Sequence, residues 1–251
     1  MSSDANNLAA HADILASFQP FTVFHALTVL ACFAAMAAAS GIGRRWRGTE
    51  RERRFCNGWA YAVLAFQTII SIYWLLPANF DLNYSLPLQL CDLAAFVAPI
   101  ALLTQRRELR TLLYFWGIGL STQAFFTPIV TTGLASLHFW LFWIGHVVIV
   151  GSAIYDVAVR GYRPSVRDLA FASAFSVVLT LAMVGLNIAM GSNYLYVGDS
   201  NPENPTLVDK LGPWPWRIPP MMALGLTVYV IIWAVWPISE ALSRKEPPET
   251  A

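Results

Sequence analysis

The chain has 251 residues, of which 57% are hydrophobic and only 12% are charged. A soluble domain carries about 25% charged residues, so this composition excludes an ordinary soluble protein and predicts one embedded in a membrane. The formal net charge of +1 and the lack of a basic tail argue against nucleic acid as a partner, and three cysteines in apolar surroundings do not make a disulfide framework.

Seven apolar segments follow one another along the chain. Residues 1–20 carry no Lys or Arg and are expected to form an N-terminal external segment. The first apolar run, Phe21–Gly43, lacks the basic start of a signal peptide, so we interpret it as a true span. The predicted membrane domain, 21–238, has spans at 21–43, 56–76, 86–103, 109–130, 137–159, 168–190 and 218–238, and a cytoplasmic tail at 239–251 follows it.

Basic residues lie almost entirely on one side of this topology. The loops after the first, third and fifth spans contain six, three and three arginines, and the tail adds Arg244 and Lys245. The other side has only Lys210 and Arg217. The positive-inside rule therefore predicts an all-α, seven-transmembrane-helix bundle with its N-terminus outside and its C-terminus in the cytoplasm. The 14 arginines against two lysines are typical of a G+C-rich bacterial genome, so we expect the bacterial inner membrane.

The third span, LPLQLCDLAAFVAPIALL, carries three polar residues near its start, namely Gln89, Cys91 and Asp92. An aspartate costs about 2.5–3.5 kcal/mol at the centre of a membrane helix, so this face should point into the bundle. Four other spans carry polar groups at a similar depth, at His25, Gln123, His146 and Asn187. This common depth predicts a polar chamber in the outer half of the membrane.

Cys91 and His146 are the pair best suited to covalent chemistry. A thiolate is a nucleophile, and a neighbouring imidazole can take its proton, which is the minimum apparatus for acyl transfer through a thioester. Structural interpretations compete with this one. A membrane cysteine is usually a packing residue, and a histidine can hydrogen-bond between helices, where Gly145 would permit a close approach.

The remaining polar groups have several possible uses. Asp92 could orient a histidine as the third member of a triad, or pair with His25 or Gln123 to hold the bundle together. A zinc site built from His25, Cys91, Asp92 and His146 is a rival interpretation, although no HxxxH or CxxC spacing supports it. Candidate supporting or substrate-binding groups, each of which could instead pack helices, are Gln89, Gln123, Asn187, Asn193 and Tyr194.

The loop 191–217 is predicted to be ordered. Asn204 and Pro205 fit the N-cap and first position of a short helix that Gly212 would end. Trp214 and Trp216 follow at the level of an interfacial aromatic belt. We therefore expect an external lid across the outer mouth of the bundle.

A small transporter or a non-enzymatic lipid-binding protein is the alternative class of function. Alternating access needs a polar route through the membrane midplane. Polar groups confined to the outer half argue against such a route, and no three-helix repeat is evident.

Several motifs carry a family resemblance over residues 20–238, namely FxxFHALT around His25, LPLQLCDLAAFVAPIALLT, YFWGIGLSTQAFFTP, HFWLFWIGHVVIV and NYLY…NPENPTLVDKLGPWPW. They resemble the YwaF-like bacterial integral membrane proteins, which are similar to the eukaryotic transmembrane protein 164 group. That group is implicated as cysteine-dependent acyltransferases that move fatty acyl chains between phospholipids and lyso-ether-phospholipids. By motif, its nucleophilic Cys and its His correspond to Cys91 and His146. The resemblance implies a lipid acyltransferase or acyl hydrolase that acts on a phospholipid or lysophospholipid without a soluble cofactor.

Overall fold

The computed structural model describes residues 14–199 and 207–243, and their secondary structure is helical apart from one isolated β-bridge between Ser17 and Thr132. In chain order the elements are α2 Val23–Arg45, α3 Glu50–Leu75, α4 Leu90–Thr104, α5 Arg107–Leu112, the π-helix η1 Leu113–Leu120, the 3-10 helix η2 Ser121–Phe125, α6 Leu137–Ala158, α7 Val166–Met190, the 3-10 helices η3 Tyr194–Tyr196 and η4 Leu207–Leu211, and α8 Ile218–Ser243. Within the described residues, five helices are long and apolar enough to cross a membrane, namely α2, α3, α6, α7 and α8.

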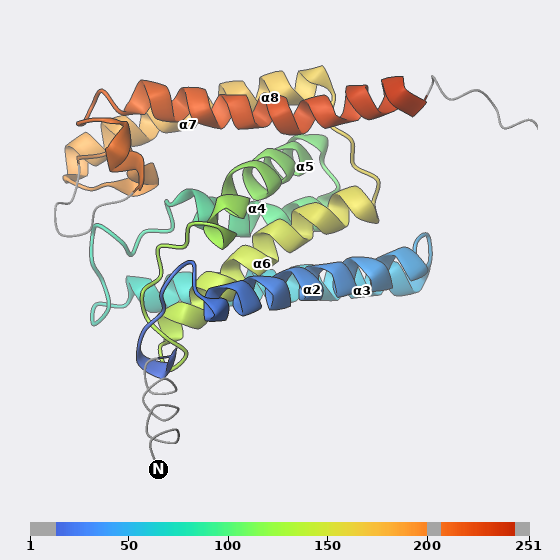
Figure 1. Ribbon diagram of the computed structural model, residues 1–251, viewed down its shortest axis with the longest axis horizontal. Coiled ribbons are helices and arrows are strands. Elements are labelled where there is room, and N and C mark those ends of the chain that lie inside the picture. The colour runs from blue at the N-terminus through green and yellow to red at the C-terminus, as the bar shows by residue number, and fades with distance from the viewer. Residues whose placement is uncertain (1–13, 200–206, 244–251) are drawn as a thin grey trace, which may run out of the picture.

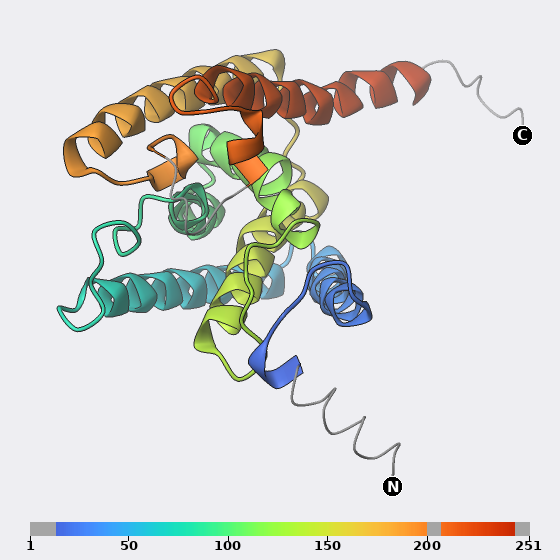
Figure 2. The ribbon, with the colours of Figure 1, turned by 60° about the vertical axis from the view of Figure 1, so that its left-hand side comes forward.

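Helix α4 lies in the middle of the bundle (Figures 1 and 2), with α2 and α3 on one side and α7 and α8 on the other. Both α3 and α6 pack against α4. The contact is close because α4 presents small residues, and Ala94, Ala98 and Ala101 are completely buried. Cys91 and Asp92, in the first turn of α4, therefore lie close to both α3 and α6.

Helix α3 begins six residues earlier than predicted, at Glu50 instead of Cys56. The hydroxyl of Thr49 accepts a hydrogen bond from the backbone N–H of Glu52 at 3.4 Å, which caps the helix. The arginines at 51, 53 and 54, predicted to lie in a loop, are therefore part of the first turns of α3.

Helix α4 begins later than predicted, at Leu90 instead of Leu86. Pro87 lies in the irregular segment that precedes it, and the backbone N–H of Gln89 donates to Oδ2 of Asp92 at 3.2 Å, which caps the helix. With 15 residues, α4 is about 22 Å long, which is shorter than the roughly 30 Å hydrocarbon core. A helix of this length does not by itself cover the full thickness of the hydrocarbon core.

The predicted fourth span, 109–130, is a composite of α5, η1 and η2 that ends at Phe125. A Cβ added to Gly117 would lie 2.9 Å from Cβ of Ala153, so the backbone of η1 approaches α6 as closely as glycine allows. Residues 126–136 contain no helix, and Pro128, which has no backbone N–H to donate, lies among them.

The last span also differs in length, because α8 continues to Ser243 instead of ending at 238, with Pro237 inside it. Residues 244–251 of the predicted tail, residues 1–13 of the predicted external segment, and Asn204–Pro205 lie outside the described residues.

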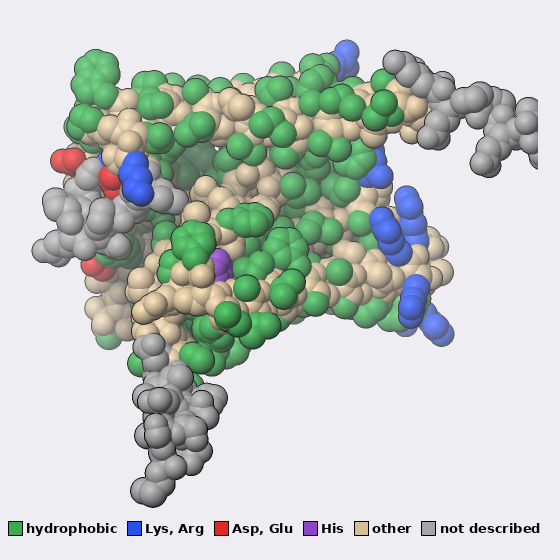
Figure 3. Space-filling model, in the orientation of Figure 1, with side chains coloured by type: hydrophobic (Ala, Val, Ile, Leu, Met, Phe, Trp, Pro, Cys, Tyr) green, Lys and Arg blue, Asp and Glu red, His purple; other side chains and the backbone are tan. Residues whose placement is uncertain are grey.

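The surface of the bundle suits a membrane. Large apolar side chains are exposed along its outer helices, such as Leu30 on α2, Ile69 on α3, Val178 on α7 and Ile231 on α8. Figure 3 shows Lys and Arg side chains gathered mainly at one end of the bundle and acidic side chains at the other. We call these the basic end and the acidic end.

Buried ion pairs join the helices near the basic end. The sequence analysis, which found polar groups in only one half of the spans, did not predict these pairs. Arg110 Nε donates to Asp156 at 2.9 Å, and Arg160 Nε donates to Glu52 at 3.0 Å. The hydroxyl of Tyr155 also donates to Glu52, at 2.9 Å. These contacts connect α3, the composite segment and α6 at the end of the bundle away from Cys91.

The N-terminal segment forms part of the acidic end. Phe18 N–H donates to the carbonyl of Thr131 at 2.7 Å, and Leu134 N–H donates to the carbonyl of Ile14 at 3.2 Å. A Cβ on Gly133 would lie 2.7 Å from the carbonyl carbon of Leu15, so only glycine permits this contact. Residues 14–18 thus hold the stretch before α6 in place.

Candidate active site

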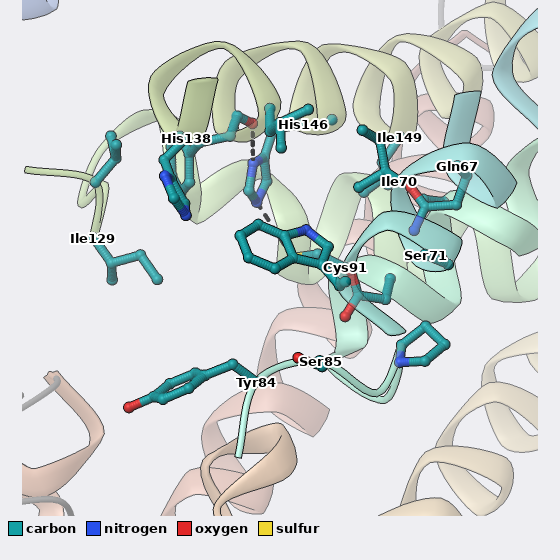
Figure 4. A pocket seen from close by; sticks show the side chains of 18 of the residues that line it. Gln67, Ile70, Ser71, Tyr84, Ser85, Cys91, Ile129, His138, His146 and Ile149 are labelled. Carbon is teal, nitrogen blue, oxygen red and sulfur yellow. Dashed lines mark hydrogen bonds between the residues drawn. The ribbon is translucent and has the colours of Figure 1, made fainter. Parts of the chain in front are cut away.

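A cavity of about 510 Å³ lies between α3, α4 and α6 towards the acidic end (Figure 4). Its walls come from α3 and α6, α4 supplies one side, and the segments 84–87 and 129–132 border it. The rings of Trp74 and His138 meet across it, with centroids 5.3 Å apart. The polar side chains that line it belong to Gln67, Ser71, Tyr84, Ser85, Cys91, Asp92, Thr131, Thr132, His138 and His146.

The structure brings Cys91 and His146 together in this cavity. Sγ of Cys91 lies 3.3 Å from Nε2 of His146, which is within hydrogen-bonding distance for sulfur. Cys91 is in the first turn of α4 and His146 is in the third turn of α6, so the contact joins two helices that pack directly against each other. His146 is only 8% exposed, although it lines the cavity.

The tautomer of His146 follows from its second contact. Nδ1 lies 2.7 Å from the carbonyl oxygen of Phe142, one turn earlier in α6 (Figure 4). A carbonyl only accepts, so Nδ1 carries the proton. In the neutral imidazole Nε2 is then the acceptor, and it faces the thiol of Cys91. The ring is therefore oriented as a base towards the sulfur. The ring of Phe142 packs against the His146 ring, with centroids 4.4 Å apart.

Asp92 pairs with none of the histidines in the described part of the chain. Its carboxylate accepts the backbone N–H of Gln89 and caps α4, and it also lines the cavity. The Gln89 side chain turns the other way and accepts the N–H of Leu195 at 3.0 Å. Both residues thus fix the start of α4, and with it the position of Cys91.

His25 does not line the cavity, and the structure does not bring it to Asp92. Its Nδ1 accepts from the backbone N–H of Phe21 at 3.0 Å, so Nε2 carries the proton and donates to the carbonyl of Phe125 at 3.0 Å. The Nε2 bond joins α2 to the end of η2, and the Nδ1 bond holds Phe21 just before α2. Gln123, the other partner considered for Asp92, is exposed on η2.

Asn187 organises the start of loop 191–217 instead of contacting the cavity. Its Nδ2 donates to the carbonyl of Tyr194 at 2.8 Å, and its Oδ1 accepts from Ser192 Oγ and Tyr194 N–H at 2.8 and 2.9 Å. Asn193 similarly accepts the N–H of Gly198 at 2.9 Å. Fully buried Tyr194 donates its hydroxyl proton to the carbonyl of Leu82 at 2.6 Å.

The described part of loop 191–217 differs from the expected lid. None of its described residues lines the cavity. Trp214 donates to the carbonyl of Val197 at 3.0 Å, and Tyr194, Val197 and Trp214 pack with residues of α7 and α8. The short helix before Gly212 is present as η4, and Trp216 is 76% exposed. The described part of the loop therefore packs at the end of α7, the start of α8 and the start of α4.

Gly145 also differs from its predicted role. We expected it to permit close helix packing, but a Cβ added there would meet no described atom within 4 Å, and the residue lines the cavity. Its lack of a side chain leaves space beside His146.

Within residues 14–199 and 207–243, no group of three or more His, Cys, Asp or Glu side chains is placed to hold a metal ion. The four side chains considered as zinc ligands are not gathered, because both ring nitrogens of His25 are bonded elsewhere.

Several polar residues of the site were missed by the sequence analysis, among them Tyr84, Ser85, Thr131 and Thr132 in the bordering segments. Gln67 and Ser71 line the cavity from α3, and their spacing of four residues in an apolar span was the available signal. Ser121 is 2% exposed, and its hydroxyl has no hydrogen-bond partner among the described residues. Ser121 directly follows the π-helix η1, whose period hydropathy does not report.

Of the comparisons with known proteins, the one with family models found a match. A model of the TMEM164 family matches residues 16–236 of the chain. No curated protein and no solved structure matches it.

Proposed function

The chain belongs to the TMEM164 family, and on this premise we propose that it is a membrane-embedded lipid acyltransferase or acyl hydrolase. Its substrates are phospholipid acyl esters, which react through a Cys91 thioester with His146 as the base. One observation carries the proposal: Sγ of Cys91 lies 3.3 Å from the unprotonated Nε2 of His146, beside a 510 Å³ cavity.

The first half-reaction forms the thioester. His146 Nε2 takes the thiol proton as Sγ of Cys91 attacks the carbonyl carbon of the ester, and an S–C bond forms. The tetrahedral intermediate then collapses and its C–O bond to glycerol breaks. The leaving alkoxide receives the same proton from Nε2, so a lysolipid departs with a neutral hydroxyl.

The second half-reaction regenerates the thiol. The hydroxyl of a lysolipid, or water, gives its proton to Nε2 and attacks the thioester carbonyl. The S–C bond breaks and the proton returns to sulfur. A lysolipid acceptor gives acyl transfer, and water gives hydrolysis.

The N-terminus of α4 supports the charge changes in both steps. The first backbone N–H groups of a helix have no acceptor within it, and they form the positive end of the helix dipole. Leu90 and Cys91 contribute such groups. Donors of this kind stabilise the oxyanion of an acyl-transfer intermediate, where loss of one donor costs about 100- to 1,000-fold in rate.

We further propose seven membrane crossings, in which α4 and the composite α5–η1–η2 segment add two to the five long helices. The gathering of Lys and Arg at one end supports a cytoplasmic basic end, hence an external N-terminus and a cytoplasmic C-terminus. The reaction then takes place in the outer half of a bacterial inner membrane, and the lipid enters sideways from the bilayer.

The contacts below the cavity favour this function over transport. Trp59 Nε1 donates to Ser152 Oγ at 3.2 Å and ties α3 to α6, and the ion pairs near Asp156 lie beyond it. A transported solute would need a route through these contacts.

The test measures acyl exchange between phospholipids and lysophospholipids in vesicles that contain the purified protein. Cys91→Ser and His146→Ala should each lower the exchange rate at least about 100-fold. Cys32→Ser is the matched control, because Cys32 packs among apolar side chains outside the cavity, and it should retain the wild-type rate. Wild-type exchange in either site variant refutes the proposed mechanism.

A further inference from the structure

Helix α3 carries two polar side chains that face the cavity and have no hydrogen-bond partner among the described residues. Gln67 and Ser71 are one helical turn apart on the same face, and both line the cavity. The other polar residue nearby, Thr68, is exposed and bonds the carbonyl of Leu64 at 2.7 Å, as a lipid-facing threonine does. Gln67 and Ser71 therefore differ from Thr68 in facing inwards.

Neither inward side chain is satisfied by the described protein. The hydroxyl of Ser71 is buried and has no hydrogen-bond partner among residues 14–199 and 207–243. Gln67 likewise has no hydrogen bond from its amide within those ranges, and Figure 4 shows it on the cavity wall near Ser71. A buried polar group without a partner costs free energy, so the Ser71 hydroxyl is expected to take a partner from outside the protein when the cavity is filled, and the Gln67 amide beside it is free to do the same.

The position of the pair suggests which partner it takes. Gln67 lies eight residues before the end of α3, and His146 lies nine residues after the start of α6, so both are about 12–14 Å from the acidic ends of their helices. Gln67 thus lines the same cavity as the Cys91–His146 pair, at a similar number of residues from the end of its helix. The amide and hydroxyl offer N–H and O–H donors, which match the ester and hydroxyl oxygens of a glycerol backbone.

We propose that Gln67 and Ser71 form a binding site for the glycerol backbone of the lipid, and that they hydrogen-bond its ester or hydroxyl oxygens while an acyl ester lies at Cys91. This inference extends the proposed function by adding a substrate-positioning wall on α3. Apolar side chains flank the pair along the same cavity, at Phe66, Ile70 and Trp74, and they are suited to the acyl chains.

The experiment separates binding from chemistry. In a Cys91→Ala parent, which cannot form a thioester, phosphatidylethanolamine bound to the detergent-purified protein is titrated by native mass spectrometry. Gln67→Met and Ser71→Ala are added to this parent singly and together. Each lost hydrogen bond should weaken binding about two- to twelvefold. Thr68→Val is the matched control and should leave binding unchanged.

Two further readouts distinguish binding from a structural role. Thermal stability of the lipid-free variants should be unchanged or raised, because an unpartnered polar group is removed. In a protein that retains Cys91, the rate of alkylation by a small thiol reagent should also be unchanged.

Three results would overturn the inference: no bound phospholipid in the parent, equal binding by parent and double variant, or a loss of stability that parallels the loss of binding. Gln67-dependent binding in a protein whose wild type shows no acyl exchange would instead count against the proposed function, and this inference would stand.

Discussion

Filling the cavity at Gly145 should abolish lipid chemistry without harming the fold. A Cβ at this position would meet no described atom within 4 Å, so the first carbon of a leucine side chain fits there without movement of the backbone. The new side chain projects into the 510 Å³ cavity next to His146. Replacing a helical glycine by leucine also removes a propensity cost of about 0.8–1 kcal/mol, so the free energy of unfolding should be unchanged or slightly higher.

The effect on activity follows from geometry. A displacement of about 1 Å from the reactive position can cost about 100-fold in rate, and a leucine side chain intrudes further than that. Acyl exchange in vesicles should therefore fall at least about 100-fold, while the thermal unfolding temperature is maintained.

Gly185→Leu provides a matched control. Gly185 is exposed on α7, and a Cβ there also meets no described atom within 4 Å. This variant should exchange acyl groups at the wild-type rate. Undiminished exchange by Gly145→Leu would refute the assignment of this cavity as the substrate site.

Two predictions concern the stability of the bundle. Asp156→Asn leaves the Arg110 guanidinium, which is 17% exposed, without its buried anion, so it should lower the free energy of unfolding by about 3 kcal/mol. Asp156→Leu with Arg110→Met should recover much of this loss in thermal unfolding, and no recovery would show that the charges themselves are needed. Asn187→Ala removes three buried hydrogen bonds of about 0.5–1.5 kcal/mol each. Hydrogen exchange at residues 191–199 should accelerate by at least tenfold, and unchanged protection would contradict the role of Asn187 as an organiser of this loop.

The long apolar helices were predictable because about 20 apolar residues leave few alternatives in a membrane protein. Helices α2, α6 and α7 begin within two residues of their predicted starts, at Val23, Leu137 and Val166. The irregular parts were harder to predict. Pro87 and the Asp92 cap delay the start of α4, and the π-helix at Leu113–Leu120 depends on close packing that hydropathy does not report.

The candidate site was predictable to a similar extent. Depth along the helices indicated that Cys91 and His146 lie at one level, and the structure brings them together. Depth does not give rotation about the helix axis. His25 and Asn187 therefore share that level but make their bonds outside the cavity, whereas Gln67 faces into it.

The most direct test of the account is to identify an acyl-enzyme intermediate. The purified protein is incubated with a phospholipid whose acyl chain carries an alkyne, denatured rapidly, digested and examined by mass spectrometry. The account predicts an acyl thioester on Cys91 that hydroxylamine removes and that decays when a lysophospholipid is added. Continued acyl exchange with no label on Cys91, or equal labelling of Cys32 and Cys56, would contradict it.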